Sequence, residues 1–178
     1  NATFYIPDAR FGRNNRNSWT GKGGNQQWGD MFGESYMNTL DYGKILDVPN
    51  GAYIFTADVA VTYHDERNIK EYDGGATPTI SVNGNTAKFF TTKTLDVGEM
   101  EKAFAGGQCK VTFGVEVTDG KLNINLESSR ADIWATWDNF ELTYYGPDAE
   151  VGSIMFGSLF KQVEDLRASA NGYVANPE

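Results

Sequence analysis

Alternation of apolar and polar residues dominates the pattern of this chain and predicts β-strands. From Gly51 to His64 one side is apolar and aromatic while the other is more polar, as in a half-buried antiparallel strand. Residues 37–48 are expected to pair with it as a hairpin. The turn between them is Pro49-Asn50-Gly51, in which proline presets φ and glycine allows a positive φ.

Other alternating segments surround two further turns. Asn83-Gly84 is a strong two-residue hairpin signal. Asp119-Gly120 is a second hairpin signal. It separates two apolar rows, which we expect to share one face, because a one-residue slip would turn every side chain outward. The predicted strands are residues 2–6, 77–83, 86–92, 111–117, 122–126 and 135–145.

Helical spacing is limited to two segments. Residues 97–105 predict a short crossing turn that ends at two glycines. Residues 158–170 have amphipathic spacing and predict a helix. Because glycine, proline and aspartate follow one another at the end of the last strand, we expect a domain over 1–146 and a linker with a helix over 147–178.

The fold class follows from these elements. About eight short strands with glycine-rich turns predict an all-β protein, a β-sandwich of jelly-roll type with a short C-terminal helical tail. A parallel α/β fold is excluded, because helices do not separate the strands. The stretch from Pro7 to Glu34 has no clear period, and its aromatic residues favour a functional loop.

Charge narrows the choice of partner. The chain has 178 residues and a formal net charge of -9, with Lys+Arg 15 and Asp+Glu 24. This balance argues against nucleic acid and anionic membranes and favours neutral or cationic ligands. No apolar run is long enough for a transmembrane helix, so membrane insertion is not expected. The chain begins at Asn1 without an initiator methionine, from which we expect a processed or excised segment.

Catalytic constellations are not found in the sequence. His64 is the single histidine and Cys109 the single cysteine, which we expect to be buried, so a triad, a zinc site and a disulfide are not predicted. Asp138 and Glu141 are the remaining pair of carboxylates. On a regular strand, positions i and i+3 point to opposite faces, and we therefore predict that the protein is not an enzyme.

A surface that binds sugars is the prediction that remains. Sugar CH faces stack on aromatic rings, while sugar hydroxyls pair with amides, carboxylates or arginine. The candidate carbohydrate-binding residues are Trp19, Trp28, Tyr63, Tyr72, Arg130 and Trp134. Trp134 suits the core as well as the rim, whereas Trp137 is expected in the core.

Four motifs resemble one family. They are Asn1-Ala2-Thr3-Phe4, Asn17-Ser18-Trp19-Thr20, Val48-Pro49-Asn50-Gly51-Ala52-Tyr53, and the closing segment from Trp134 to Leu142 with Tyr144-Tyr145-Gly146. In these motifs residues 1–146 resemble the galactose-binding-like jelly-roll modules attached to bacterial polysaccharide-degrading and cell-surface proteins. The resemblance implies a sandwich whose first and last strands lie close together.

The resemblance also implies a function. We expect a noncatalytic carbohydrate-binding module that holds a polysaccharide or oligosaccharide, tethered to other domains of a secreted or cell-surface protein. A structural calcium is expected, with Asp138 as ligand, although Tyr5 replaces an expected glutamate, so that Asp8 or backbone carbonyls would compensate. Asp138 could instead cap a turn. The alternative function is a structural or protein-interaction spacer on the same fold.

Overall fold

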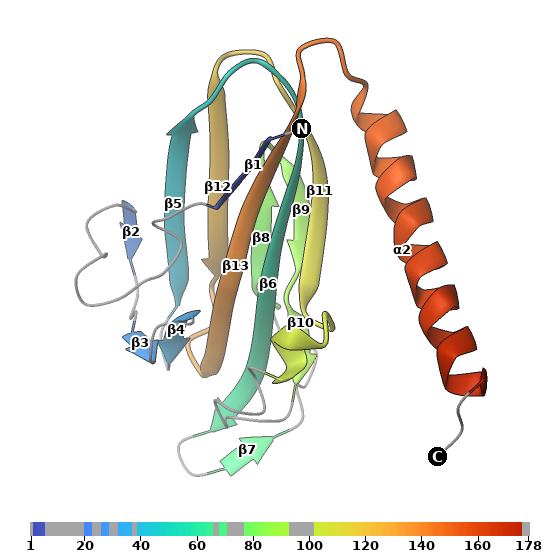
Figure 1. Cartoon of the computed structure of the whole chain (residues 1–178). Helices are drawn as coiled ribbons and strands as arrows, with labels where there is room; N and C mark the ends of the chain where they lie inside the picture. The colour runs from blue at the N-terminus through green and yellow to red at the C-terminus, as the bar shows by residue number, and fades with distance from the viewer. Residues whose placement is uncertain are drawn as a thin grey trace.

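The computed structural model describes residues 2–5, 20–22, 26–28, 32–36, 39–65, 68–70, 77–92 and 102–175. Strands make up most of this part, in two sheets that face each other (Figure 1). The strands are β1 (Ala2–Tyr5), β2 (Thr20–Lys22), β3 (Gln26–Trp28), β4 (Phe32–Tyr36), β5 (Leu40–Asp47), β6 (Gly51–Asp65), β7 (Asn68–Lys70), β8 (Thr79–Val82), β9 (Asn85–Lys88), β10 (Phe90–Thr92), β11 (Lys110–Val117), β12 (Lys121–Ser128) and β13 (Ile133–Gly146). The predicted all-β sandwich is confirmed.

Each sheet has its own order of strands. The eight-stranded sheet is built on the pair β6 and β13. On its other side β13 pairs with β4 and β1, and β3 pairs with β4. On its other side β6 pairs with β7, β10 and β11. The five-stranded sheet has the order β2-β5-β12-β8-β9. Because β1 pairs antiparallel with β13, the first and last strands lie side by side as expected.

The core fills the space between the sheets. Apolar side chains alternate inward on the central strands, as the sequence pattern predicts. The Tyr42 ring from the five-stranded sheet lies 6.1 Å from the Trp137 ring of the other sheet. Phe55 meets Phe140 edge-on at 5.6 Å. Trp137 is fully buried, which confirms its predicted place in the core.

Two predicted hairpins are wrong. β5 and β6 do not pair, since they belong to opposite sheets, and the same holds for β11 and β12. The turns at Pro49-Asn50-Gly51 and Asp119-Gly120 carry the chain from one layer to the other. They are joined by a hydrogen bond from the Gly120 N–H to Asn50 Oδ1 at 2.7 Å. The apolar rows of each pair therefore face one another across the core.

The hairpin at Asn83-Gly84 is confirmed, because β8 pairs with β9 around it. Asn83 has φ 45° and Gly84 has φ 83°, and a type I′ turn needs positive φ at both central positions. The Asn83 side chain also accepts a hydrogen bond from the Asn123 N–H at 2.7 Å. The turn is thereby tied to β12, the neighbouring strand.

The long loop predicted before residue 34 contains short strands in its described parts, namely β2, β3 and the start of β4. Their three- to five-residue lengths leave too few alternations to form a visible pattern. Residues 102–105 are helical and are followed by Gly107 at φ 70°, as predicted for the end of the short turn before β11. Residues 97–101 of the predicted turn lie outside the described residues.

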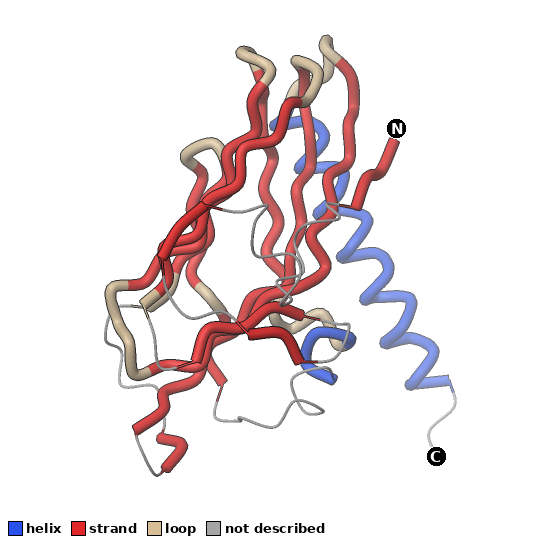
Figure 2. Tube along the Cα trace, turned by 90° about the vertical axis from the view of Figure 1, so that its left-hand side faces the viewer, coloured by secondary structure: helices blue, strands red, loops and turns tan. Residues whose placement is uncertain are grey.

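The C-terminal helix α2 (Val151–Ala175) is longer than the sequence pattern predicts. Its first turns lie against β11 and β6, and it runs beside the sandwich in both views (Figures 1 and 2). The contact is close at Gly114, where an added Cβ would lie 2.5 Å from both Val151 Cγ1 and Met155 Cγ. No described helix is long and apolar enough to cross a membrane.

Candidate functional site

One pocket opens at the end of the five-stranded sheet, where β5 and β8 begin and β12 ends. Its volume is about 460 Å³. Most of the lining side chains carry hydroxyl or carboxylate groups. They are Leu40, Asp41, Thr77, Thr79, Glu127, Ser128 and Ser129.

The register of the sheet places the two carboxylates together. Asp41 pairs with Glu127 across β5 and β12, and Glu127 pairs with Thr79 across β12 and β8. Cross-strand partners project to the same face with Cβ atoms about 5 Å apart. Asp41 and Glu127 are exposed on that face, and neither takes part in the ion pairs of the side chains that the structure describes. The site therefore offers adjacent acceptors to a hydrogen-bond donor.

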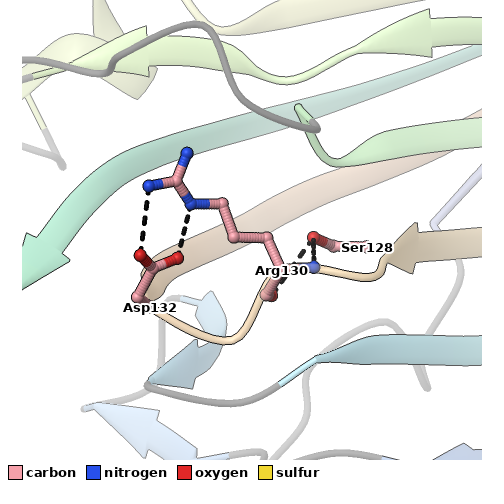
Figure 3. A network of polar contacts seen from close by, with 3 residues as sticks. All are labelled: Ser128, Arg130 and Asp132. Atoms are coloured by element: carbon pink, nitrogen blue, oxygen red, sulfur yellow. Dashed lines mark hydrogen bonds and ion pairs between the residues drawn. The ribbon is translucent and has the colours of Figure 1, made fainter.

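The loop from β12 to β13 borders the pocket and contains Arg130, one of the predicted sugar-binding residues. Figure 3 shows how its backbone and side chain are held. The Arg130 N–H donates to Ser128 Oγ at 3.1 Å, and the guanidinium forms a two-point ion pair with Asp132 through Nε and Nη2. The side chain is 14% exposed. Its charge is thus matched inside the loop by Asp132, so the guanidinium does not pair with Asp41 or Glu127.

Two of the predicted aromatic residues are placed by the pairing of their strands alone. Tyr63 lies on β6 opposite Ile133, the residue at which the loop enters β13. Trp28 lies on β3, whose neighbour β4 pairs with β13. For these two residues the structure gives the backbone position. Trp19, Tyr72 and the predicted metal ligand Asp8 lie outside the described residues.

The burial of Trp134 contradicts the prediction that this residue binds carbohydrate. Its side chain is 2% exposed and packs with Ala60, Phe104 and Cys109 on the outer side of the eight-stranded sheet. The helical turn at 102–105 covers this position, which sequence periodicity could not show. A ring enclosed in this way cannot stack on a sugar, so Trp134 is not a carbohydrate-binding residue in this structure. Cys109 is buried in the same cluster, as predicted.

A second polar site lies on the outer side of the eight-stranded sheet. Asp58 and Asp138 are register partners on β6 and β13, with exposed fractions of 1% and 5%. Asn139 joins them: its backbone N–H donates to Asp138 Oδ1 at 2.7 Å, and its Nδ2 donates to Asp58 Oδ2 at 2.8 Å. Asp58 Oδ1 is buried and has no hydrogen-bond partner among the described residues.

A bulge brings a third carboxylate to this side. Between Asp138 and Glu141, β13 advances three residues while β6 advances two, from Asp58 to Thr56. Asn139 takes φ 55° within this bulge. The prediction that Asp138 and Glu141 point to opposite faces is therefore wrong, because the extra residue shifts the alternation by one. Burial raises the pKa of Asp58.

The fit of this cluster to calcium is partial. Calcium takes six to eight oxygen ligands. Asp138 already accepts a hydrogen bond from the Asn139 N–H, as a turn-capping aspartate would, whereas Asp58 Oδ1 is an open acceptor. Among the described residues no three acidic, histidine or cysteine side chains form a group suited to a metal ion. Further oxygens would have to come from backbone carbonyls or from Asp8.

Sequence reasoning missed Asp41, Thr79, Glu127 and Asp58. Asp41 and Glu127 are 86 residues apart in sequence numbering, and only the pairing of β5 with β12 makes them neighbours. In the sequence each of them is a polar residue between two inward-facing residues. This pattern predicts that the residue lies on the outer face of its strand, but it does not predict which strand is the neighbour.

No protein-family model and no curated protein matches this chain. The solved structures similar to it include two with a named ligand or binding role. One is TmCBM61 in complex with beta-1,4-galactotriose, at 15% identity and a TM-score of 0.37, covering 73% of this chain and 84% of that chain. The other is the CBM22-1 xylan-binding domain from Paenibacillus barcinonensis Xyn10C, at 17% identity and a TM-score of 0.38, covering 72% and 86%. Both are carbohydrate-binding modules, the class of domain that the sequence motifs resemble.

Proposed function

We propose that this protein is a noncatalytic carbohydrate-binding domain that holds a neutral glycan in the pocket at the end of the five-stranded sheet. The observation that carries the proposal is the adjacent pair Asp41 and Glu127, exposed over a pocket of about 460 Å³ lined with hydroxyl groups. A carboxylate accepts hydrogen bonds from sugar hydroxyls, and such charged bonds contribute about 1.5–3 kcal/mol each. A neutral sugar has no charge for these carboxylates to repel.

We also propose that an aromatic side chain near the pocket stacks on the sugar. Because Trp134 is buried, the ring would come from Trp19, Trp28, Tyr63 or Tyr72, with Arg130 shaping the loop at the pocket's border. Shallow sites with few paired hydroxyls bind weakly, so we expect modest affinity for a single domain.

Catalysis by the same pair is not proposed. A glycosidase needs one protonated and one ionised carboxyl group, which requires two different environments. Asp41 and Glu127 are both exposed on the same sheet face and share their surroundings. We expect no release of products from any bound polysaccharide.

Binding to a panel of neutral glycans, measured by affinity electrophoresis and calorimetry, tests the site. Glu127→Gln is expected to weaken binding at least about 10-fold, because a charged acceptor is lost. Glu116→Gln, an exposed glutamate on β11 in the other sheet, is the matched control and should bind normally. Absence of binding to every glycan would disprove the function, and equal binding by both variants would disprove the site.

The cellular context is a further part of the proposal. We place the domain in a secreted or cell-surface polysaccharide-processing protein, tethered to other domains. Tethering would support weak binding, because it raises the effective concentration of neighbouring domains at the glycan. Detection of the natural protein in surface or secreted fractions is the expected result, and its confinement to the cell interior would contradict this address.

Calcium binding beside Asp138 is also proposed, with Asp8 and backbone carbonyls as further ligands. Its support is the open Asp58 Oδ1 next to Asp138, which would receive a cation. Millimolar calcium should raise the melting temperature of the protein, EDTA should reverse the shift, and Asp138→Asn should abolish it. An unchanged melting temperature in calcium would refute this part and leave the glycan site untouched.

The alternative of a protein-interaction domain has support of its own. Large apolar side chains are exposed along α2, away from the pocket. They suit contact with protein and leave the sheet face free for sugar, so both functions can coexist on one fold.

A further inference from the structure

Helix α2 exposes a continuous apolar stripe. Five large apolar side chains lie on it, and each is more than half exposed. They are Phe156 at 72%, Leu159 at 52%, Phe160 at 57%, Val163 at 62% and Leu166 at 70%. Monomeric proteins rarely leave so many large apolar side chains together in water, and such patches mark interaction surfaces.

The stripe is centred away from the side of α2 that lies on the sandwich, and only Leu159 and Leu166 border that side. Val151 and Met155 make that contact, over Gly114 of β11. With 3.6 residues per turn, the centre of the stripe lies roughly 100° around the helix from them. In Figure 1 the helix diverges from the strands towards its C-terminal end. The sandwich therefore leaves the stripe uncovered.

The spacing of the stripe suits another helix. Phe156, Leu159, Val163 and Leu166 follow intervals of three, four and three residues, the a and d positions of a heptad repeat. Phe156 and Phe160 already stack, with ring centroids 6.4 Å apart, which presents a firm apolar surface. Helices pair through such a/d rows by inserting each side chain between those of the partner.

Charge favours a second copy of this helix over a lipid surface. Between Phe156 and Leu166 the charged residues are Lys161, Glu164 and Asp165, and Arg167 follows directly, so the charges cancel. A neutral helix neither repels its own copy nor carries the basic face of helices that lie on anionic membranes. The formal net charge of -9 for the whole chain also disfavours such membranes.

The exposed area fits a weak homodimer. With about 200 Å² for a phenylalanine side chain and about 100 Å² for leucine or valine, the exposed fractions leave roughly 450 Å² per copy. Two copies would bury roughly 900 Å², which is the size of a small, reversible interface. We propose that two molecules of this protein associate through the apolar stripe on α2. Each dimer would carry two pockets, and two linked sites hold a polymeric ligand more tightly than one.

Sedimentation equilibrium of the full chain across a wide concentration range tests the proposal. The average mass should rise from that of one chain towards twice that value. Val163→Glu should keep the protein monomeric throughout, because it places a charge in the centre of the stripe. Ala168→Glu adds the same charge to the exposed opposite side of α2 and should associate like the unmodified protein.

Helix content and cross-linking distinguish lost pairing from lost folding. Circular dichroism should show equal helix content in Val163→Glu and Ala168→Glu. Val163→Cys should form an intermolecular disulfide on mild oxidation, since Cys109 is buried and does not compete. A monomer at every concentration would overturn the proposal, whether or not the chain then binds vesicles of phosphatidylcholine and phosphatidylglycerol. Equal dimerisation of Val163→Glu and Ala168→Glu would also overturn it.

Discussion

Asp58 and Asp138 lie opposite each other on β6 and β13, both buried on the outer side of the eight-stranded sheet. The bulge at Asn139 allows one residue to donate a hydrogen bond to each of them. Asp58 nevertheless retains a buried oxygen without a described partner. Because an unpaired buried charge is costly, we expect this pair to lower the stability of the protein when Asp58 is ionised.

We expect Asp58→Asn to stabilise the protein at neutral pH in the presence of EDTA. Burial raises the pKa of Asp58, and Glu141 acts in the same direction, while the Asn139 hydrogen bond and Lys110 lower it. A raised pKa gives stability that is present below the unfolded pKa and lost as pH rises through the folded pKa. The variant should therefore gain about 1–2 kcal/mol over the natural protein as pH rises from acid to neutral.

Urea unfolding from pH 3 to pH 7 measures this difference. Asp148→Asn, at an exposed aspartate after β13, should leave the pH profile unchanged. A loss of stability in Asp58→Asn at pH 7 without calcium would contradict the assignment of an unfavourable buried carboxylate.

Gly114→Ala should loosen the N-terminal part of α2. The new Cβ would lie 2.5 Å from Val151 Cγ1 and Met155 Cγ, so the helix or its side chains must move. We expect a loss of about 1–3 kcal/mol, typical of overpacking, together with faster hydrogen exchange over residues 151–158. Glu116→Ala, two residues further along β11, should leave the exchange of α2 as it is. Unchanged exchange in both variants would show that the helix does not depend on this contact.

Two glycine substitutions should change the stability of the protein in opposite directions. Gly51→Ala should cost more than about 1 kcal/mol, because φ is 139° and the Cβ would lie 2.5 Å from the Gly146 carbonyl oxygen. Gly157→Ala should gain about 0.5–1 kcal/mol, since its Cβ meets nothing within 4 Å in the middle of a helix. Thermal unfolding of the two variants measures the pair, and a stable Gly51→Ala protein would contradict the close approach of β6 to the end of β13.

The Cys109 thiol should be unreactive in the folded protein. Burial raises the pKa of Cys109 to about 11, and the charge of Asp58 adds to this effect. The buried thiol of Cys109 therefore contributes stability below its unfolded pKa, and this contribution is lost as pH rises through its folded pKa. With a thiol reagent at pH 8, Cys109 should react only after unfolding, whereas an exposed cysteine from Ser153→Cys should react at once. Equal rates would mean that the cluster of Trp134 and Phe104 opens readily.

Local chemistry could be predicted from the sequence, and pairing between distant segments could not. Asn83-Gly84 fixes its hairpin because both residues tolerate positive φ. At Pro49-Asn50-Gly51 the same kind of signal gives a turn but not the sheet to which each strand belongs. A turn signal specifies the local backbone, whereas packing of the two apolar rows against each other placed β5 and β6 in opposite sheets.

The sequence by itself determined the class of fold, the inward side of β6, β11 and β12 and the burial of Trp137 and Cys109, because periodicity two marks a buried face. Only the tertiary structure decided which polar residues meet. Asp41 and Glu127, and likewise Asp58 and Asp138, are neighbours through strand register, while one extra residue in β13 reversed the side to which Glu141 points. Burial of Trp134 was decided by a helical turn from another part of the chain. Side-chain alternation is a property of one strand, and register is a property of two.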